Sequence, residues 1–315
     1  MKLVYFGTPD FAAKILHGLL SNPLEAEVAL VVTGKSKPRG RHSLVPTPVA
    51  QTAQEFALPV FECDSPKDPL LVQTIQEIQL DLGVIVAWRI LPEAVFAAPK
   101  LGTINLHGSL LPLYRGAAPV QRAVWNGARE TGLTVFRLDR NIDTGNILLS
   151  KSVEVSKSDT SGDIFEKFVP VGIDLLREAI HRFVMGIVET VPQPMIGATP
   201  APKIKPEERW IDWTQPVEYV RRHIHALSPE PGAVTIVDKE RVLLYRVAVD
   251  LNATETAPPG TIRIEKKNWR VRCGDGWLQI IEAAREGRKV LTGSEFANGM
   301  VSWNGKRFID EVSPQ

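Results

Sequence analysis

The sequence predicts an α/β protein with a doubly wound, mostly parallel, Rossmann-like sheet, followed by a small C-terminal β-barrel of the OB type. In the first half of the chain, short apolar runs of strand type alternate with helical patterns. A proline-rich stretch then interrupts this pattern, and beyond it one helical pattern precedes several short strands. We therefore expect a first domain at residues 1–189, a linker at 190–206 and a barrel domain at 207–315.

The first domain opens with a strand at residues 1–7, which are mostly apolar, as in a parallel strand covered on both faces. Thr8, Pro9 and Asp10 then supply an N-cap, a first-turn proline and an early acid, so we expect a helix to about Leu20. Further strands are expected at residues 28–33, 82–87 and 102–107, and helices at 49–56, 70–78 and 162–183. This alternation favours right-handed crossovers, with ligands bound at the carboxyl ends of the strands.

Five prolines between residues 190 and 206 predict an extended connection. Beyond it, Val217, Val220, Ile224 and Leu227 recur at helical spacing. Strands are expected at residues 241–249, 261–264, 269–272 and 277–283, with a hairpin turn at residues 274–276. The tryptophans of this domain are expected mostly in its core.

Composition excludes several classes of protein. A net charge of +1 lacks the general basicity of many nucleic-acid-binding proteins, and no apolar run is long enough for a membrane span. Residues 1–7 enter a strand at once, without the pattern of a signal peptide, so we expect a cytoplasmic protein. The two cysteines, Cys63 and Cys273, lack metal-ligand spacing, so we expect reduced thiols and no metal.

Residues 35–42 form a local exception to this charge balance. They include four cations and no acid: Lys35, Lys37, Arg39 and Arg41. Such a segment is either a solvated loop or an arm that contacts phosphates, and the composition leaves both open.

The candidate site lies on the strand at residues 102–107. Side chains alternate along a strand, so Asn105 and His107 share one face at its carboxyl end. An amide that donates beside a protonated imidazole can stabilise a developing oxyanion. Asp143 is the expected partner, because a carboxylate raises the pKa of an imidazole and fixes its tautomer. Taken singly, His107 also fits a hydrogen-bonded strand end, and Asp143 fits the start of a turn.

Four segments carry a resemblance to a known family. They are FGTPDFA (residues 6–12), NLHGSLLP (105–112), YRGAAP (114–119) and DTG (143–145). Together they resemble the methionyl-tRNA formyltransferase family, and the similarity extends to APKI (201–204) and IDW (211–213) at the entry to the second domain. The sequence lacks the glycine-rich motifs that would indicate dinucleotide or ATP binding.

The resemblance implies that the α-amine of a charged initiator methionyl-tRNA attacks the formyl carbon of the co-substrate 10-formyltetrahydrofolate, without a metal. It assigns catalysis to Asn105, His107 and Asp143, and implies a C-terminal tRNA-binding domain; we also expect a monomer. The folate site would comprise Val86, Trp88, Ile90, Leu91, Pro92, Ser109, Leu110, Leu111, Pro112 and Asp139. The tRNA contacts would comprise Lys35, Lys37, Arg39, Arg41 and Lys203.

The chain departs from the family pattern at two places. Trp88-Arg89 stands where the family commonly has Tyr-Gly, and Arg140-Asn141 where it has Ala-Gly. A glycine that required a positive φ could not be replaced there without strain.

Three alternative functions remain open. A formyltransferase acting on an amino sugar nucleotide and a formyltetrahydrofolate hydrolase share the catalytic core, whereas an RNA-binding protein that has lost catalysis would keep the site as scaffold. The basic loop and the second domain favour tRNA as the substrate.

Overall fold

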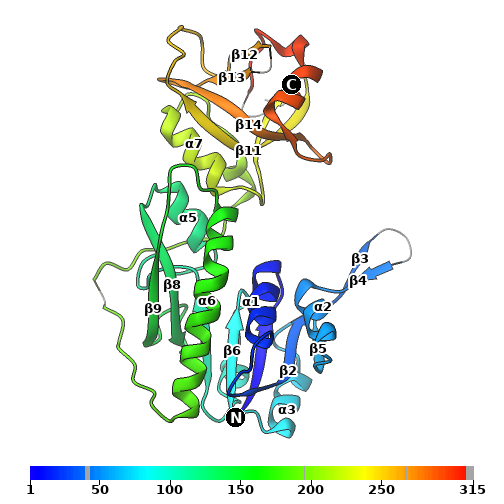
Figure 1. Ribbon diagram of the computed structural model, residues 1–315, viewed down its shortest axis with the longest axis vertical. Coiled ribbons are helices and arrows are strands. Elements are labelled where there is room, and N and C mark those ends of the chain that lie inside the picture. Colours follow the sequence, from blue (N-terminus) through cyan, green and yellow to red (C-terminus); the bar gives the residue numbers. More distant parts are fainter. Residues whose placement is uncertain (40–42, 195, 267, 310–315) are drawn as a thin grey trace. The chain divides into compact units, whose positions relative to one another are not determined.

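The structure is a computed structural model that describes residues 1–39, 43–194, 196–266 and 268–309 (Figure 1). The chain divides into two compact units. Unit 1 comprises Met1–Pro119, Glu130–Glu154 and Phe165–Ala201, and unit 2 comprises Val120–Arg129, Val155–Ile164 and Pro202–Gln315. Two segments that precede most of unit 1's last segment, Val120–Arg129 and Val155–Ile164, therefore belong to unit 2. The linker expected at residues 190–206 stays a proposal, and its residues up to Ala201 belong to unit 1.

Unit 1 is built on a seven-stranded sheet in the order β5-β2-β1-β6-β7-β8-β9. The pairs from β5 to β7 are parallel, and β7-β8 and β8-β9 are antiparallel. The predicted Rossmann-like, mostly parallel sheet is thereby confirmed. The strands are β1 (Lys2–Gly7), β2 (Glu27–Gly34), β5 (Val60–Cys63), β6 (Leu82–Val86), β7 (Thr103–His107), β8 (Glu130–Arg137) and β9 (Ile147–Glu154).

Helices cover both faces of this sheet. On one face, Val4 and Phe6 of β1 pack in a cluster with residues of α3 and α4. On the other, the Tyr5 hydroxyl donates to the Ala12 carbonyl of α1 at 2.7 Å, and Gly172 of α6 approaches Ile15 of α1. The helices are α1 (Asp10–Leu20), α2 (Pro48–Glu55), α3 (Pro69–Ile78), α4 (Glu93–Phe96), α5 (Pro119–Trp125) and α6 (Ser161–Val184), of which α5 and α6 each have residues in both units.

The predicted N-cap of α1 at Thr8 is wrong. The helix begins at Asp10, and Pro9 occupies the cap position without a side-chain hydrogen bond. The Thr8 hydroxyl instead accepts from the backbone N–H of Gly34 at 3.3 Å, which ties the end of β1 to the end of β2. A tertiary partner has here replaced the local one that the sequence pattern favours.

Unit 2 contains an antiparallel sheet in the order β10-β11-β14-β13-β12, with β15 paired to β14. Its elements are η1 (Pro206–Arg209), α7 (Val217–Ala226), β10 (Ala233–Val237), β11 (Glu240–Asp250), β12 (Ile262–Glu265), β13 (Asn268–Arg272), β14 (Trp277–Arg285), β15 (Leu291–Thr292), α8 (Gly293–Gly299) and η2 (Val301–Trp303). The predicted hairpin at residues 274–276 is confirmed, since Arg272 pairs with Trp277.

The segment at residues 305–309 closes this sheet into the predicted barrel. The backbone N–H of Ile262, in β12, donates to the Lys306 carbonyl at 2.8 Å. The N–H of Ile236, in β10, donates to the Ile309 carbonyl at 3.1 Å. The two edge strands are thus bridged, and neither edge is left without a partner.

The core of the barrel is rich in aromatic rings. Trp269 stacks on Phe296 with ring centroids 4.8 Å apart, and both are buried. Trp125, from the α5 segment of unit 2, packs against the same cluster. The tryptophans that take core positions as predicted are Trp213, Trp269, Trp277 and Trp303. Within the described ranges, no helix is long and apolar enough to cross a membrane.

Candidate functional site

Strand β7 presents Asn105 and His107 at the centre of unit 1. Its neighbours alternate as expected, with Ile104 and Leu106 buried in the core. Asn105 is partly exposed, whereas His107 is 5% exposed. The Asn105 amide has no hydrogen-bond partner among the residues that the structure describes. It is therefore available to donate to a ligand.

Both ring nitrogens of His107 face polar groups. Nε2 lies 2.9 Å from the Tyr114 carbonyl oxygen, which can only accept, so Nε2 carries a hydrogen and donates. Nδ1 lies 3.7 Å from Oδ2 of Asp143, beyond ordinary hydrogen-bond distance. The edge of the Phe136 ring completes these surroundings. The structure thus brings together the three residues that the sequence pattern singles out.

The charge state expected for His107 is wrong. Burial lowers the pKa of the imidazole from its ordinary value of 6.5, and this effect outweighs the opposing influence of Asp143 and of the Tyr114 carbonyl. The Asp143 carboxylate raises the pKa of the imidazole, as expected, but desolvation lowers it by more. At neutral pH the imidazole is therefore uncharged, with its hydrogen on Nε2 and a lone pair on Nδ1.

The turn that carries Asp143 has an unusual backbone. Asp143 has a φ of 54°, in the left-handed region that disfavours most side chains. Its Oδ2 accepts from the backbone N–H of Gly116 at 2.8 Å. Two residues later, a Cβ on Gly145 would lie 1.7 Å from the Arg137 carbonyl oxygen, so only glycine fits there. The glycine of the sequence DTG is thus required by geometry.

The segments expected to bind folate begin at neighbouring strand ends. Val86 closes β6 and pairs with Leu106 of β7, so residues 86–92 and 108–112 leave the sheet side by side. The Trp88 Nε1 atom is buried and has no hydrogen-bond partner among the described residues, whereas Ile90 is 73% exposed.

Several of the remaining residues expected in the folate site have side chains engaged in the fold. Leu91, Ser109 and Leu111 are buried, so their side chains are not available to a ligand. Leu110 and Pro112 are partly buried, as is Pro92. The Asp139 carboxylate accepts from the Thr144 hydroxyl at 2.8 Å and orders the loop before Asp143.

The departures from the family pattern do not strain the backbone. Arg89, Arg140 and Asn141 are not among the described residues with positive φ. Arg89 instead donates to the Asp64 carbonyl, and Arg140 pairs with Glu93. Large side chains are therefore accommodated at all three positions.

The basic segment expected to contact tRNA forms a hairpin of two short strands, β3 (Lys37–Arg39) and β4 (Ser43–Val45), separate from the main sheet (Figure 1). Lys35 precedes it and forms an exposed ion pair with Asp64 at 2.6 Å. Lys37 and Arg39 lie on β3, and Arg41 lies outside the described residues. In unit 2, Lys203 is exposed.

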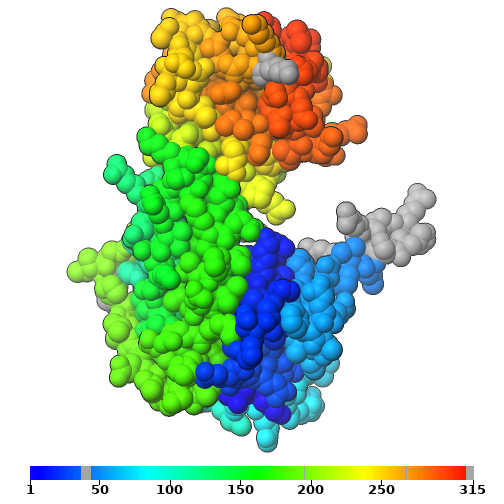
Figure 2. Space-filling view, viewed as in Figure 1, coloured from blue at the N-terminus to red at the C-terminus, as the bar shows by residue number. Residues whose placement is uncertain are grey.

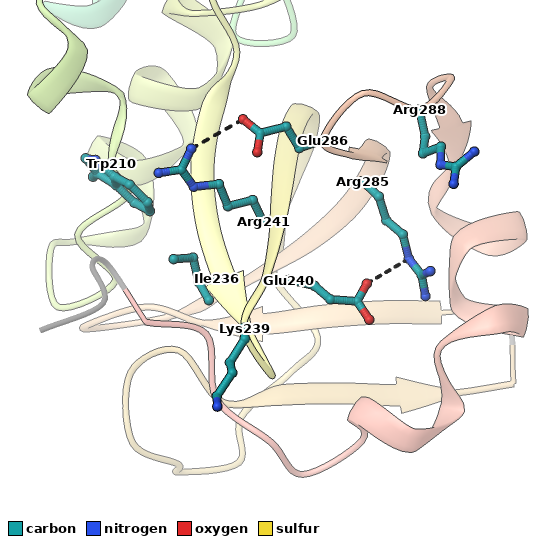
Figure 3. Close-up of a pocket in the computed structure, with 8 residues that line it drawn as sticks. All are labelled: Trp210, Ile236, Lys239, Glu240, Arg241, Arg285, Glu286 and Arg288. Carbon is teal, nitrogen blue, oxygen red and sulfur yellow. Dashed lines mark hydrogen bonds and ion pairs between the residues drawn. The ribbon is translucent and has the colours of Figure 1, made fainter. Parts of the chain in front are cut away.

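A polar pocket of about 560 Å³ lies on the barrel of unit 2 (Figure 3). It is lined by Trp210, Ile236, Lys239, Glu240, Arg241, Arg285, Glu286 and Arg288. Arg241 stacks over Trp210 and pairs with Glu286, and Arg285 pairs with Glu240.

Two cations of this pocket remain unneutralised. Lys239 and Arg288 have no acidic partner within the described part of the chain, so the pocket carries a net positive charge. No local sequence motif indicates this pocket, because its residues come from separate elements. Trp210 lines it and is partly exposed, so it is an exception to the expected core role of the tryptophans.

This combination of sheet, site and barrel is that of a formyl transferase. Residues 1–180 match the family described as "Formyl transferase", and residues 203–301 match "Formyl transferase, C-terminal domain". The chain is 36% identical to the methionyl-tRNA formyltransferase of Chlorobium phaeovibrioides, over 98% of each chain. It is 37% identical to that of Symbiobacterium thermophilum, over 100% of this chain and 97% of the relative. The chain belongs to the methionyl-tRNA formyltransferase family.

Among solved structures, HypX from Aquifex aeolicus has the same fold. The two superpose with a TM-score of 0.70 at 18% identity, over 100% of this chain and 50% of HypX. At this identity the likeness concerns the fold alone.

Proposed function

We propose that the chain transfers the formyl group of 10-formyltetrahydrofolate to the α-amine of initiator methionyl-tRNA. The observation that carries this proposal is the unpartnered amide of Asn105 beside a buried His107 whose Nδ1 faces Asp143. This group offers one donor for a developing oxyanion and one acceptor for a proton. Formyl transfer to an amine requires both.

In the reaction, a bond forms between the amine nitrogen and the formyl carbon, and the bond from that carbon to N10 of the folate breaks. The amine loses a proton and N10 gains one. The Asn105 amide donates to the formyl oxygen as negative charge develops on it. Since Nε2 of His107 already donates to the Tyr114 carbonyl, Nδ1 is the nitrogen that accepts the proton from the amine.

Asp143 acts on the charge that this proton transfer creates. Before the transfer the imidazole is neutral, because burial lowers its pKa. Once Nδ1 has taken the proton, the carboxylate 3.7 Å away stabilises the imidazolium, which then also stabilises the oxyanion. Asn105 and Asp143 keep the roles expected of them, whereas His107, expected as a charged stabiliser of the oxyanion, acts first as a neutral proton acceptor.

The folate would lie against residues 86–92 and 108–112. Supporting this placement, both segments start at the carboxyl ends of adjacent parallel strands, where ligands bind in such sheets. The buried Trp88 Nε1 is a donor without a partner at this place. When bound, 10-formyltetrahydrofolate supplies an already activated formyl group.

The substrate is tested by a formylation assay with 10-formyltetrahydrofolate and three acceptors: charged initiator tRNA, an amino sugar nucleotide and water. We expect product only with methionyl-tRNA. The basic segment of unit 1 and the positively charged pocket of unit 2 both favour a polyanionic substrate. Uncharged initiator tRNA serves as the control. Transfer to the amino sugar, or release of formate alone, would contradict the proposal.

We further propose that the pocket in unit 2 contacts RNA phosphates through Lys239 and Arg288. Replacing both by alanine should weaken tRNA binding and reduce the slope of log K against log salt concentration by about 1–2. The matched control is the Lys157→Ala, Lys266→Ala double variant, which removes two exposed cations of the same unit that do not line the pocket. Fluorescence anisotropy across a salt series measures both slopes, and equal slopes would refute the contact.

A further inference from the structure

The extended segment after α6 includes a glutamine whose amide is fully engaged. We call residues 191–194 and 196–201 the strap. From it, Gln193 Nε2 donates to the backbone carbonyls of Asp143 at 2.9 Å and Gly145 at 2.8 Å. Its Oε1 accepts from Arg115 twice, from Nε at 3.1 Å and from Nη2 at 2.7 Å.

These four contacts orient the Gln193 amide in one way only. The arginine can only donate, and the two carbonyls can only accept, so rotating the amide by 180° would place donors against donors and acceptors against acceptors. Arg115 therefore determines which end of the Gln193 amide faces the Asp143 turn. All four groups belong to unit 1.

Gln193 contacts the backbone of Asp143, which has an unfavourable conformation. Asp143 has a positive φ, a backbone conformation that persists where surrounding contacts enforce it. Gln193 bonds the carbonyls on both sides of Thr144 and so clamps the backbone of this turn. Gly116, next to Arg115, donates to the Asp143 carboxylate itself. The turn and its side chain are thus fixed from two directions.

The strap also holds the segment that contacts His107. The N–H of Arg115 donates to the Thr199 carbonyl at 2.8 Å, and the N–H of Ala201 donates to the Arg115 carbonyl at 2.6 Å. The Thr199 hydroxyl accepts from the N–H of Tyr114, whose carbonyl receives the hydrogen of His107 Nε2. The strap therefore contacts Tyr114 and Asp143, the two polar partners of the imidazole.

We propose that Gln193, oriented by Arg115, is a positioning residue that holds Asp143 against His107, so that the strap is part of the catalytic site and not only a connection. This inference rests on the proposed function, because it assumes that Asp143 acts on His107 during formyl transfer. Gln193 itself touches backbone and Arg115, and no reacting atom is assigned to it.

The first test is the Gln193→Met variant, which keeps the length of the side chain and removes its four hydrogen bonds. We expect kcat for formyl transfer to fall roughly ten- to a hundredfold, because small displacements of catalytic groups have effects of that size, with KM changing little. The matched control is Gln73→Met on α3, where the lost contact is an exposed hydrogen bond to Glu77. This control should keep the original kcat.

A double-mutant cycle tests whether Gln193 acts through Asp143. In an Asp143→Asn background, the Gln193→Met change should lower kcat less than about twofold, since the residue it positions has already lost its charge. An additive loss would overturn the proposal. If Asp143→Asn alone leaves formyl transfer unchanged, the proposed function fails instead, so the two failures are distinguishable.

A third readout does not depend on turnover. NMR titration of ¹³C-labelled histidine follows the protonation of His107, which is faced by the Asp143 carboxylate, the Tyr114 carbonyl and the Phe136 ring. Asp143 raises the pKa of this imidazole, so moving the carboxylate away should lower that pKa further. An unchanged titration in the Gln193 variant would contradict the inference.

A second variant keeps the test decisive if Gln193→Met does not fold. Gln193→Glu retains the size and the pairing with Arg115, but it sets a carboxylate oxygen against the carbonyls of Asp143 and Gly145. We expect the same loss of kcat and the same shift of the His107 titration. Original values of both in this variant would overturn the proposal.

Discussion

Replacing His107 by alanine is expected to lower kcat for formyl transfer by roughly 10²–10⁴-fold, the range typical of a lost general base. Nδ1 is the only ring nitrogen free to take a proton, because Nε2 donates to Tyr114. Binding should change little, since the imidazole is buried and its role begins with the chemical step. Steady-state kinetics with charged initiator tRNA measure the effect.

The pH dependence of kcat tests the same role of His107. A base must be neutral to act, so kcat of the original protein should fall as the pH drops through the pKa of His107. Burial lowers that pKa below 6.5, so the midpoint of the fall should lie below pH 6.5. The His107→Ala variant should lose this limb of the profile. The control is His181→Ala, an exposed histidine of α6 paired with Glu25. A His107→Ala enzyme with the original rate would exclude the mechanism.

Replacing Asn105 by alanine should lower kcat by roughly 10²–10³-fold, which corresponds to about 2.7–4 kcal/mol for one oxyanion donor. The amide has no other hydrogen bond among the described residues, so its loss should not destabilise the fold. The thermal midpoint should therefore stay close to that of the original protein. Stopped-flow or quench measurements of a single turnover isolate the chemical step.

Asn22→Ala provides the matched control for Asn105, because Asn22 is exposed and its described contact to Arg177 uses only the backbone carbonyl. A rise in KM with kcat unchanged in the Asn105 variant would mean that the amide binds substrate and transition state equally. That result would remove Asn105 from its assigned role.

Local patterns predicted the strands that are buried on both faces and the helices between them. Residues 1–7, 28–33 and 82–87 are mostly apolar runs, and each forms a parallel strand of the sheet. Asn105 and His107 could be placed on one strand because side chains alternate there. Asp143 could be linked to them by its chemistry and by the family resemblance but not by a local pattern, since 36 residues of sequence separate it from His107.

Other features could not be predicted from local sequence patterns. In the edge strand β9, half of the side chains are exposed and half are polar, so its pattern does not distinguish it from a loop. Gln193 lies between two prolines and has its partners 48 to 78 residues away. The lowered pKa of His107 depends on how deeply the fold buries the ring, which the residue types alone do not reveal.

Unit 2 includes residues 120–129, so a fragment that begins at Pro202 does not contain the whole unit. Arg122 makes a bidentate pair with Glu208, at 2.7 and 2.9 Å, and Trp125 stacks on His223. A recombinant fragment beginning at Pro202 would lack both partners, and its surface would gain an uncovered aromatic face. Proteolytic nicking near residue 202 should therefore yield two pieces that stay associated, and a barrel made alone should precipitate unless residues 120–129 are supplied in trans.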